Sequence, residues 1–367
     1  MTRVPLSVLD LSPFGTGSTP ADGLRATIAL AVETERLGYR RFWLAEHHFN
    51  PGVAGAAPHT LLAAIGAATT GIRLGTAATI IGNYAPVQVA EAFGVLAALF
   101  PGRLDLGIGR SGAPGAASTP AEAEPEVGDR VVDGLLLPAP RPFVIDPERF
   151  ALRSRLLRRS DGDADRFADD VADILAFFAG TFVAEGEPVH ATPAGAADPE
   201  VWIHGSTAGP SARLAGERGL PFGANYHVSP GRVLDALAEY RASFRPGRIA
   251  APHTIVSVDV LVGETDAEAE RLAAGFDRWV HSIRSGAGAI VYPSPDEARA
   301  RPLDAATRES VRDRVDTRFV GSPQTVVERL QTLQRVTGAD ELLVTTITHD
   351  PADRERSYGL LAAAWGL

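Results

Sequence analysis

Eight short segments rich in apolar and β-branched residues alternate with amphipathic segments along the chain. The pattern predicts strands over residues 4–10, 41–46, 73–80, 103–109, 201–205, 221–226, 253–262 and 341–348. It predicts helices over residues 21–37, 58–69, 86–100, 167–178, 211–218, 232–244, 266–281, 323–336 and 352–365. This regular alternation favours a (β/α)8 (TIM) barrel, with a doubly wound open sheet as the alternative. The open sheet is less favoured because no G-x-G-x-x-G motif follows the first strand.

Two stretches depart from the alternation, and we interpret them as insertions into a single domain spanning residues 1–367. Residues 111–165 follow the fourth strand, and residues 284–308 fall between the seventh and eighth strands. Loops of this length are usually functional or mobile. We therefore expect both insertions to form a lid or the walls of a substrate pocket.

Composition excludes several kinds of chemistry. The chain has no cysteine and no lysine. The first absence excludes disulfides, thiolate nucleophiles and iron–sulfur clusters, and the second excludes Schiff-base chemistry and a P-loop lysine. A net charge of −10 argues against general binding to nucleic acids or to anionic membranes.

The protein is expected to be cytoplasmic. No apolar run approaches the roughly 18–20 residues that cross a bilayer. The first residues also lack the layout of a signal peptide. We therefore predict neither a membrane nor a nucleic acid as a partner.

Polar side chains gather where the predicted strands end. The segment RFWLAEHH, residues 41–48, runs from an apolar strand into three ionisable residues. Active sites of this barrel class lie at the carboxyl ends of the strands. The candidates at the ends of the first, second and sixth strands are Ser12, Glu46, His47, His48, Asn225 and His227. No metal site is predicted over residues 46–48, because neighbouring strand residues point to opposite faces.

Three further motifs are rich in small residues, and two of them also carry groups that suit an anion. GTAA covers residues 75–78, GIGRS covers 107–111, and WIHGSTAGPS covers 202–211. Small residues admit a flat ring, and an arginine or a helix N-terminus suits a phosphate. Each motif also has a structural reading: close strand–helix packing, a glycine-rich strand exit with a surface arginine, and an ordinary helix cap. The residues of interest are Ala77, Ala78, Gly109, Arg110, Gly205, Ser206, Thr207 and Ser211.

Together, the motifs RLGYRRFWLAEHH, GIRLGTAATIIGNYAPVQVAEAFGVLAALFPGRLDLGIGRS and VWIHGST…GLPFGANYH resemble the bacterial luciferase-like flavin-dependent monooxygenases. The similarity is greatest to the alkanal monooxygenase-like branch. It covers residues 4–110 strongly, extends to 200–262 and 320–365, and is poor over the insertions. The resemblance implies a (β/α)8 barrel, usually dimeric, that binds reduced FMN and reacts it with O2.

The resemblance also implies roles for particular residues. His47 matches the family's catalytic histidine, and Ala77–Ala78 matches a non-proline cis peptide under the flavin ring. Arg110 and Ser206 match groups near the flavin phosphate, and we place Asn83 in the same cofactor-binding set. Gly109 stands where the luciferase subunit has a cysteine, which argues against light emission.

We predict an FMNH2-dependent monooxygenase acting on a small organic substrate that the sequence does not identify. Since no nicotinamide-binding motif is present, a separate reductase is expected to supply the reduced flavin. An F420-dependent dehydrogenase or reductase of the same superfamily is the alternative cofactor choice. A non-catalytic flavin-binding protein is the alternative from another class.

Overall fold

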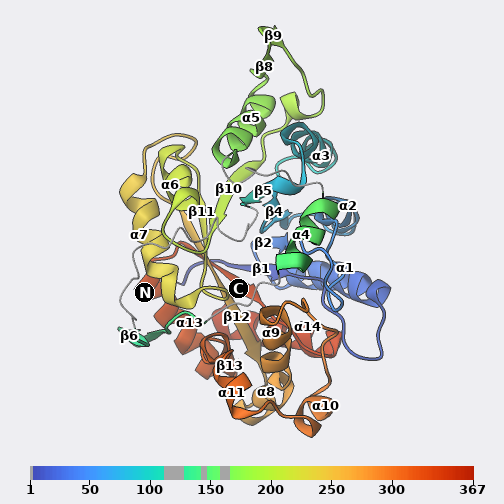
Figure 1. Ribbon diagram of the computed structural model, residues 1–367, viewed down its shortest axis with the longest axis vertical. Helices are drawn as coiled ribbons and strands as arrows, with labels where there is room; N and C mark the ends of the chain where they lie inside the picture. The colour runs from blue at the N-terminus through green and yellow to red at the C-terminus, as the bar shows by residue number, and fades with distance from the viewer. Residues whose placement is uncertain (1–2, 111–127, 142–146, 158–165) are drawn as a thin grey trace.

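The computed structural model describes residues 3–110, 128–141, 147–157 and 166–367. Eight parallel strands form a closed barrel at the centre of the molecule (Figure 1), because β5 pairs with β10 and β14 pairs with β1. The predicted (β/α)8 barrel is confirmed. In order around the barrel the strands are β1 (Leu6–Asp10), β2 (Arg41–Leu44), β3 (Arg73–Thr76), β5 (Leu104–Gly109), β10 (Glu200–Gly205), β11 (Phe222–Asn225), β12 (Thr254–Val262) and β14 (Glu341–Thr345).

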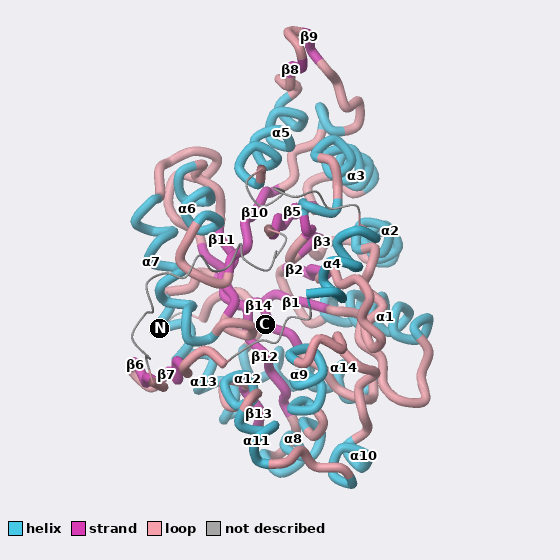
Figure 2. The backbone as a smooth tube through the Cα atoms, in the orientation of Figure 1, coloured by secondary structure: helices cyan, strands magenta, loops and turns pink. Residues whose placement is uncertain are grey.

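In the described part of the chain, eight helices follow these strands and lie around the outside of the barrel (Figure 2). Several begin with a proline in the first turn, where a missing N–H costs no hydrogen bond. The helices are α1 (Pro20–Arg36), α2 (Pro58–Ala68), α3 (Pro86–Leu99), α5 (Phe167–Ala179), α6 (Pro210–Glu217), α7 (Val233–Ser243), α13 (Pro323–Thr337) and α14 (Pro351–Trp365).

Shorter strands and helices are added to the barrel. The extra strands are β4 (Thr79–Ile80), β6 (Arg130–Val132), β7 (Leu135–Leu137), β8 (Val183–Ala184), β9 (Glu187–Pro188) and β13 (Phe319–Gly321). The extra helices are α4 (Pro147–Leu156), α8 (Asp266–Ala273), α9 (Phe276–Arg284), α10 (Pro295–Ala300), α11 (Ala305–Glu309) and α12 (Arg312–Val315), with 3₁₀ turns η1 (Ile81–Asn83), η2 (Ala194–Ala196) and η3 (Pro230–Arg232). Among the described helices, none is long and apolar enough to span a bilayer.

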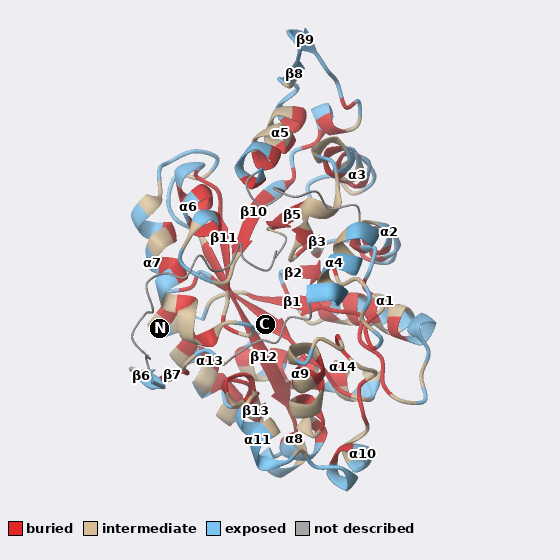
Figure 3. Cartoon of the chain, in the orientation of Figure 1, coloured by how far each residue is buried: buried red, intermediate tan, exposed pale blue. Residues whose placement is uncertain are grey.

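Alternate residues along each strand belong to two separate cores. Val8 and Phe42 pack outward with the helices, whereas Leu9, Trp43 and Trp202 fill the barrel interior. Figure 3 shows the result, with buried strands at the centre and exposed outer surfaces on the helices. This period-two division is what a barrel imposes on its strands.

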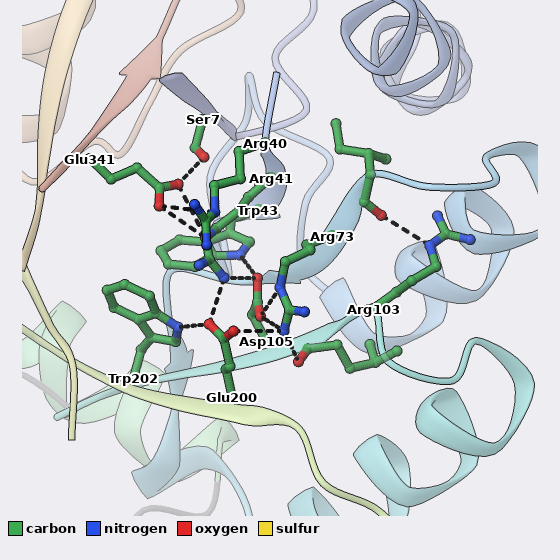
Figure 4. A network of polar contacts seen from close by, with 12 residues as sticks. Ser7, Arg40, Arg41, Trp43, Arg73, Arg103, Asp105, Glu200, Trp202 and Glu341 are labelled. Atoms are coloured by element: carbon green, nitrogen blue, oxygen red, sulfur yellow. Dashed lines mark hydrogen bonds and ion pairs between the residues drawn. The ribbon is translucent and has the colours of Figure 1, made fainter. Parts of the chain in front are cut away.

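The amino-terminal end of the barrel interior is closed by a buried charged cluster (Figure 4). The Arg41 guanidinium lies 2.8 Å from both Asp105 and Glu200, and 3.1 Å from Glu341. The Trp43 indole N–H donates to Asp105 at 2.9 Å. These contacts join β2, β5, β10 and β14 beneath the aromatic layer, and so fix the strands whose other ends form the candidate site.

Two predicted elements are interrupted in the structure. The strand expected over 73–80 ends at Thr76, and Thr79–Ile80 pairs separately with β5 after a break at Ala77–Ala78. The helix expected over 266–281 is two helices, because the chain leaves the helical conformation at Ala274 and Gly275 has a φ of 97°. Only glycine adopts that φ readily.

The insertion predicted over 284–308 is longer than expected. It continues through α11 and α12 to β13, which adds in parallel to β12. Asn50, just after His48, accepts from the Ala289 N–H at 2.8 Å and donates to the His48 carbonyl at 2.9 Å. The insertion is thereby tied to the loop after β2. Of the insertion predicted over 111–165, residues 111–127, 142–146 and 158–165 lie outside the described part of the chain.

Candidate active site

A cavity of about 440 Å³ lies at the carboxyl ends of the barrel strands. Its lining residues come from segments as far apart in the sequence as Leu9 and Ser229. Of the predicted site residues, those that line it are Glu46, His47, Ala77, Ala78, Gly109, Arg110, Gly205, Ser206, Thr207, Ser211, Asn225 and His227. The remaining three, Ser12, Asn83 and His48, are not among its lining residues.

The segment after β2 supplies His47 and the neighbouring carboxylate of Glu46. The His47 backbone N–H donates to the Gly55 carbonyl at 3.0 Å. Burial lowers the pKa of the His47 imidazole, and the Glu46 charge opposes part of that shift. The imidazole is therefore neutral near pH 7 and can accept a proton.

Glu46 is buried and holds the neighbouring predicted residues. It accepts from His48 at 2.8 Å, from Asn83 at 2.5 Å and from the Ile80 backbone N–H at 3.1 Å. His48 and Asn83 thus lie behind the cavity wall as supports of Glu46. Ser12 is fully buried, and its backbone N–H donates to Asp10 at 2.7 Å.

A wall of small residues follows β3. The peptide bond between Ala77 and Ala78 is cis, as the resemblance implied. A Cβ added to Gly109 would lie 2.9 Å from the Ala78 Cβ, so the two backbones approach closely. This wall leaves room for a flat ring and offers it no charged group.

Another part of the cavity suits an anion. Ser206, Thr207 and Ser211 surround the start of α6, whose N-cap residue, Gly209, gives no side-chain cap. Pro210 has no N–H, so the backbone N–H groups of the first turn that can face a ligand begin with that of Ser211, and a helix N-terminus favours negative charge. Arg110 lines the same cavity.

His204 is a cavity residue that the sequence did not single out. Its ring lies 5.5 Å from the Trp43 ring, and burial lowers its pKa to about 4. Its Nε2 is buried with no hydrogen-bond partner among the described residues. The available signal was its two-residue spacing from Trp202, which puts both side chains inside the barrel.

Asn225 at the end of β11, His227 two residues later and Ser257 on β12 form a second polar group. The Asn225 side-chain amide donates to the Ser206 hydroxyl at 3.0 Å. The Ser257 hydroxyl lies 2.5 Å from His227 Nδ1 and 3.3 Å from Asn225 Oδ1. Ser257 was not a predicted site residue, because it lies in mid-strand. No cluster of three or more His, Asp or Glu side chains suited to a metal ion is found among the described residues.

A family model described as luciferase-like monooxygenase matches residues 4–341. The chain belongs to the luciferase-like monooxygenase family. It is an oxidoreductase of that type. Within the family, the Bacillus subtilis (strain 168) protein YvbT is 33% identical over 363 residues, which cover 98% of this chain and 96% of YvbT.

An Escherichia coli (strain K12) relative named luciferase-like monooxygenase is 30% identical over 359 residues, covering 97% of this chain and 96% of that protein. The Bacillus subtilis (strain 168) N-acetyl-S-alkylcysteine monooxygenase is 47% identical over 108 residues, which cover 29% of this chain and 32% of that enzyme.

Several solved structures share the fold. Apo-MsnO8 superposes with a TM-score of 0.80 at 32% identity, covering 100% of this chain and 99% of the other. The oxygenating constituent of 3,6-diketocamphane monooxygenase from Pseudomonas putida, in complex with FMN, has a TM-score of 0.67 at 22% identity, covering 98% and 97%. An F420-dependent secondary alcohol dehydrogenase has a TM-score of 0.61 at 13% identity, covering 99% of each chain.

Proposed function

We propose that this protein uses reduced FMN and O2 to oxidise a small organic substrate. The observation that carries the proposal is the meeting of three features around one cavity: the His47 imidazole, the small-residue wall and the uncapped start of α6. A planar ring with a phosphate matches all three. Membership of the luciferase-like monooxygenase family makes a flavin the natural candidate.

The lining residues fit FMN by their chemistry. Ala77, Ala78 and Gly109 would face the ring, because they are small and apolar. Ser206, Thr207, Ser211 and Arg110 would hold the phosphate through hydroxyls, helix N–H groups and a guanidinium. When bound and reduced, the flavin supplies the electrons for the reaction of O2 with the substrate.

His47 is the residue we propose as general base and acid. His47 lines the cavity, and its imidazole is neutral near pH 7 because burial lowers its pKa. The hydrogen bond from its backbone N–H to the Gly55 carbonyl holds the main chain in place. Glu46 fixes the adjoining segment through His48 and Asn83. The imidazole can therefore take up or release a proton without moving the chain.

Replacement of His47 by alanine tests this role. We expect substrate oxidation to fall by roughly 10²–10⁴-fold, the typical contribution of general acid–base catalysis, while FMN affinity changes little. Turnover is measured as product formed from a panel of thioethers, aldehydes and ketones with FMNH2 supplied by a reductase, and affinity by flavin fluorescence. His190→Ala, at an exposed position, is the control. Lost FMN affinity with intact turnover would contradict the assignment.

One observation favours the alternative cofactor F420. Beyond Thr207 a second cavity, of about 990 Å³, is lined by Arg130, Arg141 and Arg232 as well as by Asp129 and Asp235. Arginines beside a phosphate site suit an extended acidic tail. Within the first cavity, by contrast, Arg110 is the one described arginine.

Titration distinguishes the two cofactors. FMN and F420, each in the reduced form, are added to the protein and followed by absorbance. Tighter binding of FMN supports the proposal. Tighter binding of F420, weakened when Arg130 or Arg141 is replaced by alanine, would establish the alternative.

We further propose that a separate reductase supplies the reduced flavin and that the protein is a homodimer. α2 and α3 contain a single charged residue, Glu91, and α3 exposes Val95 and Leu99 by 48% and 60%. An apolar helical surface of this kind supports association with a second copy. Light scattering coupled to size exclusion measures the oligomeric state.

A further inference from the structure

A chain of hydrogen bonds crosses three strands at the mouth of the barrel. It runs from His227 to Ser257, from Ser257 to Asn225, and from Asn225 to Ser206. Asn225 and Ser257 are directly paired in the register of β11 and β12, so the sheet itself holds them together. One end of this chain is an imidazole in the cavity, and the other is a hydroxyl at the proposed phosphate site.

The acceptors around Ser257 determine where its one proton lies. Its hydroxyl is 3.3 Å from the Ala224 carbonyl and 3.3 Å from Asn225 Oδ1, and both of these atoms only accept. His227 Nδ1, at 2.5 Å, can either donate or accept. If Ser257 donated to Nδ1, its lone pairs would face two oxygens without a proton between them. When Nδ1–H donates to Ser257, the single Ser257 O–H can donate onward to the Ala224 carbonyl or to Asn225 Oδ1, so one more of the three contacts holds a proton than in the opposite arrangement.

This direction of donation continues to the far end of the chain. The Asn225 Nδ2–H group donates to Ser206, which leaves the Ser206 hydroxyl proton free to point at an anion. At the near end, the proton on Nδ1 leaves a lone pair on His227 Nε2. Because Nδ1 is turned toward β12 and the ring lines the cavity, Nε2 is the nitrogen left to meet a ligand.

The surroundings of His227 disfavour its protonated form. Burial lowers the pKa of its imidazole well below the usual value, and the positive charge of Arg314 together with His47 and His204 adds to that effect. Arg314 is itself paired with Asp259 at 3.2 Å. A neutral ring with a fixed proton is thus the expected state across the neutral pH range.

We propose that Ser257 holds His227 in the Nδ1–H tautomer, and that Nε2 accepts a hydrogen bond from an N–H or O–H group of the molecule in the cavity. Ser257 is a positioning residue, since it acts through His227. The tautomer is a property of the protein alone, whereas the hydrogen bond that Nε2 accepts from a bound molecule rests on the proposed function. The substrate or the flavin itself could provide the donor, and the experiment distinguishes them.

The tautomer is measured by nitrogen-15 NMR of ligand-free protein labelled at its nine histidines. The His227 signals are those lost in His227→Gln. We expect a protonated Nδ1 and an unprotonated Nε2 at pH 7. Ser257→Ala should abolish this preference, and Ser257→Thr should retain it by keeping the hydroxyl, with circular dichroism confirming that both variants fold. A protonated Nε2 in the wild type, or a tautomer unchanged by Ser257→Ala, would overturn the proposal.

The ligand role is tested on the same samples. A shift of the Nε2 resonance on adding FMN identifies the flavin as the donor. If FMN leaves the signal in place, acetamide is added, with N,N-dimethylacetamide as the control that lacks an N–H group. A shift with acetamide but not with N,N-dimethylacetamide indicates that the substrate provides the donor. If none of the three compounds shifts the Nε2 signal, the acceptor role is overturned. Flavin fluorescence records FMN binding separately, so that failure of the proposed function is recognised as such.

Discussion

The position of His204 depends on two glycines on neighbouring strands. A Cβ added to Gly223 would lie 2.3 Å from His204 Nδ1, and one added to Gly107 would lie 2.8 Å from Nε2. These strands therefore leave the space that the ring occupies beside the cavity. Their glycines serve close packing rather than a turn, since neither has a positive φ.

Replacement of Gly223 by alanine should lower the free energy of unfolding by about 1–3 kcal/mol, the usual cost of overpacking a core. Urea unfolding followed by circular dichroism measures the change. Gly359→Ala is the matched control: it lies within α14, a Cβ there would meet no atom within 4 Å, and we expect no loss or a gain of up to ~1 kcal/mol. Equal losses in the two variants would contradict the packing argument.

At the scale of the elements, Arg41 joins four strands through one guanidinium. Asp105 and Glu341 are buried with it, and Glu200 is partly exposed. Burial raises the pKa of Asp105, and the charges of Arg41 and Arg73 oppose that rise. Without Arg41, these carboxylates would be left in the barrel with one guanidinium fewer to balance them.

Arg41→Met should therefore cost about 3–5 kcal/mol in the free energy of unfolding, as expected when one partner of a buried ion pair is removed. Arg40→Met is the control, because Arg40 is 47% exposed and only touches Glu341 at 3.6 Å. Its loss should stay below ~1 kcal/mol. Thermal and urea unfolding of both variants measure the two losses. Equal losses in Arg41→Met and Arg40→Met would show that the buried network does not stabilise the fold.

At the scale of the whole molecule, buried histidines make stability depend on pH. Burial lowers the pKa values of His47, His59, His204 and His227. Above about pH 6.5 these histidines are neutral in both the folded and the unfolded chain, so they do not make the free energy of unfolding depend on pH there. Below that pH the unfolded chain binds protons that the folded chain does not, so the folded state loses stability as the pH falls.

For His204, whose pKa is about 4, this loss should reach about 2 kcal/mol between pH 7 and about pH 5. Urea unfolding at the two pH values measures it. His204→Gln should remove that part of the pH dependence, whereas His190→Gln, at an exposed position, should leave it unchanged. A His204→Gln variant that loses as much stability as the wild type would refute the assignment.

Much of the sequence-based prediction rested on the alternation of strands and helices and on the residues at the strand ends. The alternation of strands and helices predicted the barrel, because each strand of a parallel barrel needs a covering helix before the next one. Residues near the strand ends, such as His47, Ala77, Arg110 and Ser206, were predicted from their position together with the family resemblance, and all four line one cavity. Breaks inside elements were missed where one residue, such as Gly275, decides the path.

What the sequence determined by itself is therefore which residues stand at the carboxyl ends of the strands, since that depends on local pattern. Only the tertiary structure decided which of them meet. His204, Ser257 and the Arg41 cluster lie within strands, where the local pattern indicates at most which face a polar residue takes and not what it contacts. Their contacts arise from the register between strands far apart in the chain, and closure of the barrel brings those inward-facing side chains within hydrogen-bonding distance.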